Sequence, residues 1–528
     1  MKSLMKKVFA AAAAIATVFG LAATTVATAN AADNATLTVS TTDAKFAGKT
    51  VNAYKMFSAT VSGDGKAVSY TLTDEWKPFF KNSVGLTGVT DENVNDKAND
   101  YVSKLKDSTL VAFATKASNW AQTKANNITA DATATVSADA SNGKYTATFT
   151  GLGYGYYVVA VPGATLANAK SQYATLVSVH STKVDADIKG DLPTVDKKVQ
   201  VDGTGKDATD AKIGDTLTFT LTSTIPDMSA YDTYTFNFKD TLSKGLTFGQ
   251  VKSVKVENVT LTENTDYTVT TPTASNNNTL TVAMKDFKTK QQANAGKKIT
   301  VTYTATLNEN AVVGGAGNVN SAKIQYSNNP STNGTGESEP SKVRVFTYGF
   351  TVDKYTGDQY TDAATRLAGA EFTLAHKDGS AISFVQVSAG SATANAVYRV
   401  AKAGETGTTT ITTPANGKVV FEGLKNGEYT LTETEAPAGY NKLASAIGVK
   451  VNGQNDGTDT TNATVTITYN NDNGNDYNQT ASNGVIPVHN KSGVTLPGTG
   501  GMGTIAFTVI GVLVIALGVA WTLKRKNA

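Results

Sequence analysis

A lysine and a glutamate in two alternating segments could together promote a covalent crosslink between the lysine and an asparagine. In the segment Phe350 to Lys354, alternation places Lys354 on the same face as Phe350 and Val352. The same alternation places Leu431 and Glu433 on one face. Burial favours the neutral form of an amine and the protonated form of a carboxylic acid. With an asparagine side chain alongside, such an amine can attack the amide carbonyl. Ammonia then leaves and an isopeptide bond forms.

These segments belong to a chain in which much of the sequence alternates as half-buried β-strands do, which predicts antiparallel sandwiches. The clearest alternating runs are Val68–Leu72, Tyr145–Phe149, Thr216–Leu221, Lys298–Leu307 and Ala463–Tyr469. A fresh strand is also expected at Val343–Val352. Between about Asp91 and Lys124 the apolar residues are spaced as in helices, which predicts one or two helical segments within the first domain.

The amino-terminal end has the composition of a secretory signal peptide. Three lysines precede an apolar stretch at Val8–Ala23, and small residues follow it. Ala29-Asn30-Ala31 is suited to cleavage, and Ala27-Thr28-Ala29 also fits. The sequence therefore predicts export, with a mature chain that begins near Ala32 or Asp33.

The carboxyl-terminal end has three elements in the order of a cell-wall sorting signal. The first is a pentapeptide made of Leu496, Pro497, Gly498, Thr499 and Gly500. An apolar stretch of about 20 residues from Thr504 to Leu523 follows, long enough to cross a bilayer as a helix. The basic residues at 524–526 would stay in the cytoplasm. In such a signal a sortase cuts between Thr499 and Gly500, so the membrane span is expected to hold the chain only transiently.

The charge of the exported chain differs from that of the full sequence. The 528 residues contain 47 Lys and Arg against 44 Asp and Glu, for a formal charge of +3. The two removed ends carry six basic residues and no acid, which leaves 41 against 44, or −3. This balance argues against a nucleic-acid-binding protein.

Disulfides and metals are not expected to stabilise this exported protein. The sequence contains no cysteine, so it can form no disulfide, and a long exported chain of this kind invites a search for another crosslink. His180, His376 and His489 are scattered and lack metal-ligand spacing, so neither a metal nor a cofactor is expected. The mature part, roughly 465 residues, suits about three domains. The predicted divisions are 1–31 for the signal peptide, 32–190, 191–342 and 343–494 for the three domains, and 495–528 for the sorting signal.

The third domain resembles the collagen-adhesin B-type domain of Gram-positive surface proteins. The resemblance covers about residues 343–500 and is carried by Phe350–Lys354, Leu367–Leu374, Ile486–Lys491 and a segment similar to the E-box of sortase-assembled pilins. The E-box residues are Tyr429, Leu431, Glu433, Thr434, Ala436, Pro437, Gly439 and Tyr440. The resemblance implies that Lys354 and Asn490 form the isopeptide bond and that Glu433 promotes it.

The second domain resembles the middle domain of major pilins. The resemblance is carried by the segments Pro193–Val199, Phe238–Phe248 and Asn320–Pro330. It implies a second bond between Lys197 and Asn320, promoted by Asp240, with Lys198 and Asn318 as the adjacent alternatives. The first domain contains a segment at Thr150–Val159 similar to one in pilin amino-terminal domains, but no lysine, acid and asparagine set, so no bond is expected there.

The whole chain resembles a sortase-assembled major pilin, or fimbrial backbone subunit, of a Gram-positive bacterium. The resemblance implies an all-β chain of tandem immunoglobulin-like sandwiches of the collagen-adhesin A and B types. A pilus sortase would join Thr499 to a lysine of the next subunit. Lys189 is the expected acceptor because it lies just before the strand that opens the second domain, and Lys183 is the alternative. The Tyr-Pro that usually accompanies this lysine is missing here.

The expected role is structural and supports adhesion, with single-turnover crosslinking as its only chemistry. The expected partners are the pilus sortase, identical subunits, peptidoglycan at the filament base, minor or tip pilins and host surface ligands, but no nucleic acid. The competing hypothesis is a monomeric adhesin anchored to peptidoglycan. A surface enzyme is disfavoured because no cleft signature organises the acidic pairs.

Overall fold

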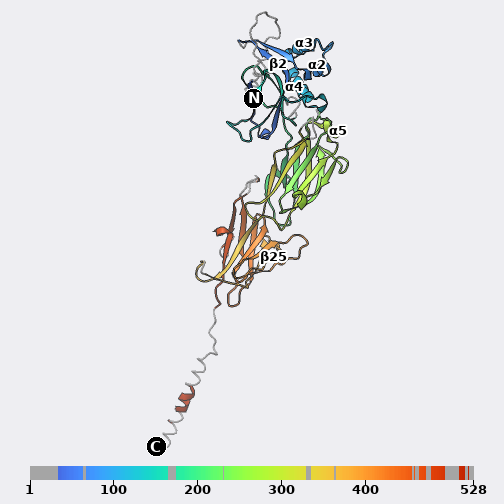
Figure 1. The fold of residues 1–528 in the computed structure, drawn as a ribbon. Coiled ribbons are helices and arrows are strands. Elements are labelled where there is room, and N and C mark those ends of the chain that lie inside the picture. Colours follow the sequence, from blue (N-terminus) through green and yellow to red (C-terminus); the bar gives the residue numbers. More distant parts are fainter. Residues whose placement is uncertain are drawn as a thin grey trace. The chain divides into compact units, whose positions relative to one another are not determined.

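The computed structural model describes two compact units, most of whose elements are β-strands (Figure 1). One unit comprises Met1–Thr347 with Gly453–Thr464, and the other comprises Tyr348–Asn452 with Val465–Ala528. The described residues are 34–63, 67–164, 174–229, 231–328, 334–361, 364–454, 457, 463–470, 477–493, 511–517 and 521. The all-β fold class predicted from alternation is confirmed.

The described residues of the predicted first domain, 32–190, form two sheets. The smaller has the order β5-β1-β8, and its middle strand is antiparallel to β5 but parallel to β8. The larger has the order β3-β2-β6-β7, with β4 paired to β2. The bounds are β1 (Ala35–Thr41), β2 (Thr50–Val61), β3 (Val68–Leu72), β4 (Ala132–Thr135), β5 (Tyr145–Leu152), β6 (Gly155–Ala160), β7 (Ala174–Val179) and β8 (Lys183–Asp187).

Helices cover one face of the larger sheet. They are α2 (Lys77–Asn82), α3 (Val94–Ser103) and α4 (Asp107–Gln122). The last two confirm the helical insert predicted between Asp91 and Lys124. Phe79 and Phe80 of α2 and Phe113 of α4 are buried in a cluster that includes Phe57 of β2. The apolar side of this insert therefore closes a second core within the first domain.

The middle domain is a sandwich of two larger sheets. One has the order β10-β9-β12-β18-β14-β15, and the other has the order β11-β21-β19-β13-β17-β16, with β20 paired to β19. The bounds are β9 (Asp196–Val201), β10 (Thr204–Lys206), β11 (Ala208–Asp210), β12 (Thr216–Thr224), β13 (Phe236–Leu242), β14 (Leu246–Val256), β15 (Val259–Thr260), β16 (Tyr267–Thr270), β17 (Thr279–Met284), α5 (Phe287–Gln291), β18 (Lys298–Leu307), β19 (Asn318–Ser327), β20 (Thr335–Glu337) and β21 (Ser341–Phe346).

The third domain is also built from two sheets. One has the order β23-β22-β28-β26-β25, with β33 paired to β22, and the other has the order β27-β24-β29-β30-β31-β32. The bounds are β22 (Tyr348–Thr356), β23 (Thr365–Arg366), β24 (Glu371–His376), β25 (Phe384–Ser388), β26 (Ala396–Val400), β27 (Ile411–Thr412), β28 (Lys418–Leu424), β29 (Gly427–Glu435), β30 (Ile447–Gly453), β31 (Val465–Tyr469), β32 (Gln479–Thr480) and β33 (Val485–His489). Short 3-10 turns complete the described elements at Ala44–Phe46, Asp74–Trp76, Lys124–Asn126, Ala274–Asn276, Gln292–Asn294 and Ser482–Gly484.

The single strand predicted over Val343–Val352 is two strands in the structure. β21 pairs with β19 and β11, whereas β22 pairs with β28 and β33. Thr347 lies between them, and its backbone oxygen accepts a hydrogen bond from Gly314 N at 2.8 Å. This bond to a loop takes the place of a ladder bond and separates the two strands.

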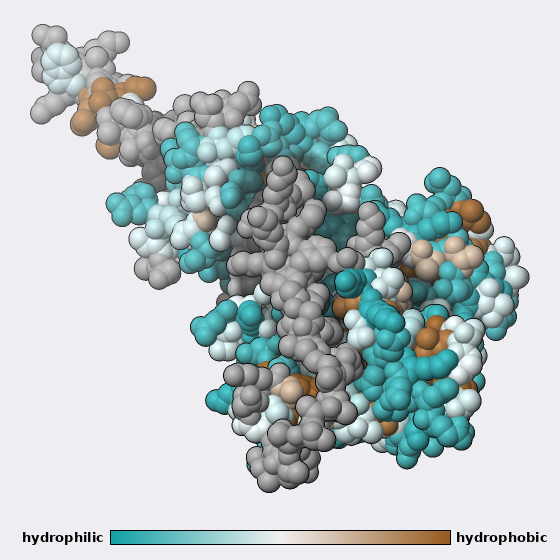
Figure 2. Space-filling model, turned by 90° about the horizontal axis from the view of Figure 1, so that it is seen from above, coloured by the Kyte–Doolittle hydropathy of each residue, from teal (hydrophilic) through white to brown (hydrophobic). Residues whose placement is uncertain are grey.

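Both targeting segments fall mainly outside the described residues. The signal peptide at 1–31 and the pentapeptide from Leu496 to Gly500 lie wholly outside them, and of the predicted span only 511–517 and 521 are described, as helix. Within the described residues, no helix has the length and apolar character needed to cross a membrane. This short piece nevertheless exposes a run of large apolar side chains, and most of the surface that Figure 2 shows elsewhere is hydrophilic. They are Val512, Leu513, Val514, Ile515, Leu517 and Trp521.

Candidate crosslinking sites

The first and last strands of the third domain lie side by side and carry two of the predicted site residues. β22 and β33 pair in parallel, with Lys354 opposite Val488. Asn490 directly follows β33, and its backbone N donates to Tyr355 O at 3.0 Å, which continues the pairing. The register therefore places the Lys354 and Asn490 side chains next to each other at one end of the strand pair.

Glu433 reaches the same place from the facing sheet, where it lies on β29. Lys354, Glu433 and Asn490 are all at most 2% exposed. Lys354 Nζ donates to Asn490 Oδ1 and lies 3.3 Å from Glu433 Oε1. Asn490 Nδ2 donates to the same Glu433 oxygen at 3.0 Å. The structure thus brings together the three residues that the sequence predicted for this site.

The E-box turn holds the Glu433 carboxylate in position. Leu443 N donates to Glu433 Oε2 at 2.7 Å, which leaves Oε1 for the lysine and the asparagine. Gly439 has a φ of +90°, a left-handed conformation that favours glycine in the turn after β29. Its backbone oxygen accepts from Gly493 N at 2.8 Å, so the turn contacts the chain just after Asn490.

The other E-box residues support this turn from their own positions. Leu431 is fully buried on β29, and Tyr429 OH donates to Lys425 O at 2.6 Å. Thr434 Oγ1 donates to Glu371 O at 3.2 Å. Pro437 O accepts from Tyr440 N at 3.0 Å, which closes the turn that Ala436 precedes. These contacts give the E-box a role in placing one carboxylate beside the last strand.

The predicted middle-domain residues also meet, from two facing sheets. Lys197 lies on β9, Asp240 on β13 and Asn320 on β19, and none has any exposed surface. Lys197 Nζ forms a buried ion pair with Asp240 Oδ2. The side chains of Asp240 and Asn320 come from neighbouring strands, in which Leu242 is opposite Asn320.

A residue that the sequence did not single out, Tyr303 of β18, lies at the centre of this group. Its hydroxyl donates to Asp240 Oδ2 at 2.6 Å. The Tyr303 hydroxyl oxygen in turn accepts from Lys197 Nζ at 2.8 Å and from Asn320 Nδ2 at 2.6 Å. An inward-facing tyrosine in an alternating strand has the pattern of ordinary core, so the sequence carried no signal that set Tyr303 apart.

Burial changes the protonation of both candidate nucleophiles. It lowers the pKa of Lys354 to about 8, although the charge of Glu433 acts in the opposite direction. It also lowers the pKa of Lys197 to about 8 against the attraction of Asp240. A substantial share of each amine is therefore neutral, and nucleophilic, at mildly alkaline pH. Burial raises the pKa of Tyr303 well above its usual value, so its hydroxyl keeps its proton.

The two adjacent alternatives lie in other surroundings. Lys198 is partly exposed, and its Nζ lies 2.6 Å from Asp207 Oδ1 and 3.5 Å from Asp196 Oδ1. Asn318 is buried, but its amide group bonds to the backbone of Val312 and Val345. Neither contact set includes a lysine beside an asparagine.

The candidate acceptor lysines lie at the end of the first domain. Lys183 begins β8 and is exposed. Lys189 follows β8, and about a third of its side chain (32%) is exposed. Its Nζ lies 3.5 Å from Asp187 Oδ2, a loose surface contact that leaves the amine accessible to another molecule.

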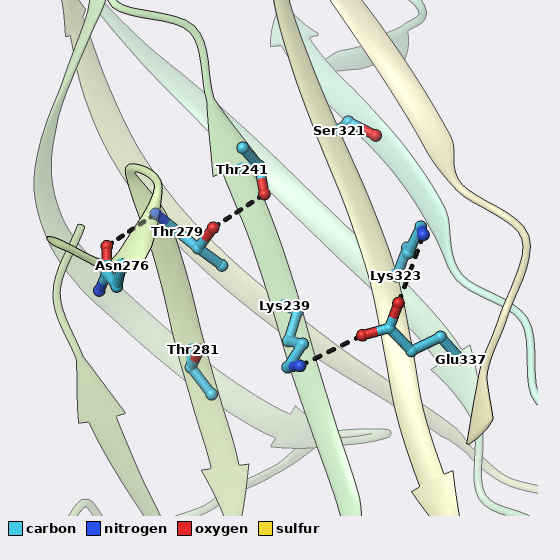
Figure 3. A pocket seen from close by; sticks show the side chains of 8 residues that line it. All are labelled: Lys239, Thr241, Asn276, Thr279, Thr281, Ser321, Lys323 and Glu337. Carbon is cyan, nitrogen blue, oxygen red and sulfur yellow. Dashed lines mark hydrogen bonds and ion pairs between the residues drawn. The ribbon is translucent and has the colours of Figure 1, made fainter. Parts of the chain in front are cut away.

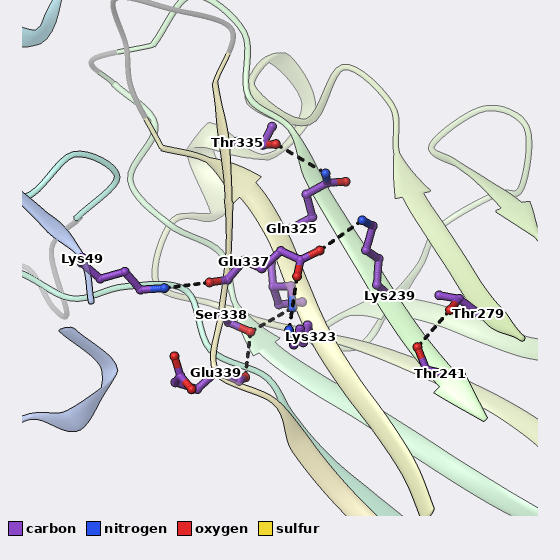
Figure 4. A network of polar contacts seen from close by, with 11 residues as sticks. Lys49, Lys239, Thr241, Thr279, Lys323, Gln325, Thr335, Glu337, Ser338 and Glu339 are labelled. Carbon is purple, nitrogen blue, oxygen red and sulfur yellow. Dashed lines mark hydrogen bonds and ion pairs between the residues drawn. The ribbon is translucent and has the colours of Figure 1, made fainter. Parts of the chain in front are cut away.

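A polar groove of about 360 Å³ lies on the outer face of the middle domain (Figure 3). Its lining residues are Lys239, Thr241, Asn276, Thr279, Thr281, Ser321, Lys323 and Glu337. Glu337 accepts from Lys239 at 3.2 Å and from Lys323 at 3.3 Å, and its backbone oxygen accepts from Lys49 Nζ at 3.0 Å (Figure 4). The groove contains none of the predicted site residues. In the described part of the chain, no group of three His, Cys, Asp or Glu side chains could hold a metal ion.

Three families match separate parts of the chain. Residues 213–330 match the family described as Gram-positive pilin backbone subunit 2, Cna-B-like domain. Residues 358–466 match a prealbumin-like fold domain, and residues 489–528 match the LPXTG cell wall anchor motif. The sandwiches and these matches define a surface protein of the bacterial cell wall. In these segments the chain is similar to Gram-positive pilin backbone subunits and to proteins with an LPXTG cell wall anchor.

Streptococcal proteins are among the relatives. The chain is 25% identical to the trypsin-resistant surface T6 protein of Streptococcus pyogenes serotype M6 over 279 residues, which cover 48% of this chain and 44% of that protein. The chain therefore spans less than half the length of this curated relative. The solved T6 backbone pilin of serotype M6 S. pyogenes is 20% identical, with 80% of this chain and 83% of that chain covered and a TM-score of 0.45. A 35 kDa C-terminal fragment of the major pilin GBS80 of Streptococcus agalactiae is 24% identical, with 57% and 100% covered and a TM-score of 0.41.

Proposed function

We propose that this chain is the repeating subunit of a covalently polymerised pilus. The observation that carries the proposal is a pilin backbone domain and a cell-wall anchor motif in one chain. A pilus sortase would cleave after Thr499 and transfer its carbonyl to a lysine amine of the next identical subunit. Peptidoglycan would accept the last subunit at the filament base. Minor or tip pilins and host surface ligands would be further partners in adhesion.

Each of the last two domains would also crosslink itself once. The amine of Lys354 would attack Cγ of Asn490, the Cγ–Nδ2 bond would break, and ammonia would leave. Glu433 supports this reaction because its Oε1 contacts both the amine and the leaving nitrogen. Lys197 and Asn320 would react in the same way beside Asp240. Each bond forms once per molecule, so the chemistry is single-turnover.

Crosslink formation is expected to accelerate as the pH rises toward about 8. Only the neutral amine attacks, and Lys354 and Lys197 both have a pKa of about 8. Below that pH the neutral fraction, and with it the rate, should fall about tenfold per pH unit. In the test, freshly made chain is unfolded in urea before its crosslinks form. It is then diluted into buffers of different pH, and the loss of ammonia is followed by intact mass. A rate that is the same across the acidic buffers would contradict the proposal.

Polymerisation is expected to depend on Thr499, which supplies the carbonyl group of the bond between subunits, and on one lysine, which supplies the amine. Thr499→Ala should remove the high-molecular-weight ladder from SDS gels of wall extracts. Lys189→Arg should also remove it, because a guanidinium keeps the charge but is not a nucleophile at neutral pH. Lys183→Arg is the matched control on the same short segment and should leave the ladder intact.

The outcomes of this experiment separate the candidate functions. A single wall-linked band from the wild-type chain would contradict the pilus and favour the monomeric adhesin. A ladder that survives Lys189→Arg but not Lys183→Arg would move the acceptor to Lys183 and keep the pilus.

A further inference from the structure

We propose that Tyr303 is a catalytic residue of the middle-domain crosslink, where its hydroxyl carries a proton to the leaving nitrogen of Asn320. The inference rests on the proposed crosslinking function and adds a residue to it. The Tyr303 hydroxyl touches both atoms that exchange a proton, since it lies 2.8 Å from Lys197 Nζ and 2.6 Å from Asn320 Nδ2.

The two candidate sites differ in how the acid reaches the asparagine. In the third domain, Glu433 Oε1 bonds directly to Asn490 Nδ2 at 3.0 Å. In the middle domain, the acid is aspartate, whose side chain is one methylene shorter. Asp240 Oδ2 bonds to Lys197 and to Tyr303, and it is the tyrosine that bonds to Asn320 Nδ2. The Tyr303 hydroxyl therefore occupies the gap that the shorter acid leaves.

The hydrogen bonds of this group direct the proton transfer through one oxygen. Asp240 Oδ1 is buried and has no hydrogen-bond partner among the described residues, so Oδ2 makes all the contacts of this carboxylate. A tyrosine hydroxyl has one proton to donate and two lone pairs to accept with. Tyr303 uses all three, toward Asp240, Lys197 and Asn320. Its ring is held by stacking on Phe219, with ring centroids 5.3 Å apart.

The proposed reaction moves one proton from the amine to the leaving nitrogen while one bond forms and one breaks. The neutral amine of Lys197 forms the Nζ–Cγ bond with Asn320, and one proton leaves Nζ for the carboxylate of Asp240. Tyr303 gives its hydroxyl proton to Asn320 Nδ2 and is reprotonated by Asp240. The Cγ–Nδ2 bond breaks with its electron pair on nitrogen, ammonia leaves, and Asp240 ends as the carboxylate.

Tyr303→Phe tests this proposal because it removes only the hydroxyl. The full mature chain would be diluted from urea and its mass followed with time. The wild type should lose two ammonias, one from each domain. Tyr303→Phe should lose the third-domain ammonia at the wild-type rate and the middle-domain ammonia about 100-fold more slowly or not at all, as expected for a lost acid–base group. Peptide mapping would assign the remaining bond to Lys354 and Asn490.

A second variant separates catalysis from packing. In Tyr303→Phe/Asp240→Glu, the longer acid can reach Asn320 directly, as Glu433 reaches Asn490, so middle-domain crosslinking should recover. Lys197→Met provides the reference for a folded, unlinked middle domain in circular dichroism. If the Tyr303→Phe variant forms the middle-domain crosslink at the wild-type rate, the proposed role of Tyr303 is overturned. It is also overturned if the double variant folds but does not recover middle-domain crosslinking. A wild-type chain that loses no middle-domain ammonia would instead overturn the crosslink itself.

Discussion

Glu433→Gln is expected to leave the third domain without its crosslink and to lower its free energy of unfolding by about 4–5 kcal/mol, by the loop-closure estimate for a crosslink of this span. Glutamine keeps the shape of the side chain but cannot donate and accept the carboxyl proton. The bond it prevents would join Lys354 to Asn490 and close a loop of nearly the whole domain. For a domain of this size the midpoint of thermal unfolding should fall by about 10–15 °C. Intact mass and calorimetry of the same sample would measure both effects.

The matched control for this change is Lys377→Ala in the same domain. Lys377 forms a surface ion pair with Glu428, and 64% of its side chain is exposed. An exposed pair of this kind contributes little to stability, so the variant should lose both ammonias and unfold at the wild-type temperature. Glu433→Gln that still loses the third-domain ammonia would contradict the assigned role of Glu433.

Asp240→Ala is expected to be the most destabilising single change in the middle domain. It should prevent the crosslink and also leave Lys197 buried without its acid. Removing one partner of a buried ion pair costs about 3–5 kcal/mol, in addition to the loss of about 4–5 kcal/mol for the missing crosslink. Chemical denaturation followed by far-UV circular dichroism would measure the loss of stability, and intact mass of the same sample would report the missing crosslink.

The pH dependence of Asp240→Ala provides a signature of the unpaired lysine. Burial lowers the pKa of Lys197 and Asp240 raises it, so the pKa should fall further without the acid. The unfolded chain then binds more protons than the folded one at neutral and mildly alkaline pH, and stability should rise from about pH 7 to about pH 9. The control is Lys197→Met/Asp240→Leu, which also lacks the crosslink but buries no charge. Equal pH profiles for the two variants would contradict this account.

The sequence predicted local structure well because alternation is a local property. The runs at Val68–Leu72 and Lys298–Leu307 coincide with β3 and β18. Alternation also predicted that Lys354 and Glu433 face inward, and both are buried. The crosslinks themselves remain predictions. By contrast, the division of Val343–Val352 at Thr347 depends on a hydrogen bond from a loop residue, Gly314, which alternation cannot show.

Contacts between distant segments were harder to predict from the sequence. The parallel pairing of β22 with β33 joins residues more than 130 positions apart, such as Lys354 and Val488. It was expected only through the family resemblance. Tyr303 was missed because a core tyrosine and a catalytic one have the same pattern in a strand. Only its three hydrogen bonds to Lys197, Asp240 and Asn320 distinguish it.

The position of Lys189 after β8 determines which parts of a polymerised subunit would bear tension. A filament joined from Thr499 to Lys189 would transmit a pull along the chain between these two residues. The first domain, whose β1 and β8 both precede Lys189, is not part of the chain segment that would bear this tension. The parallel pairing of β1 with β8 would then carry no load that acts to separate the two strands. The two domains proposed to carry crosslinks are the ones through which the force would pass.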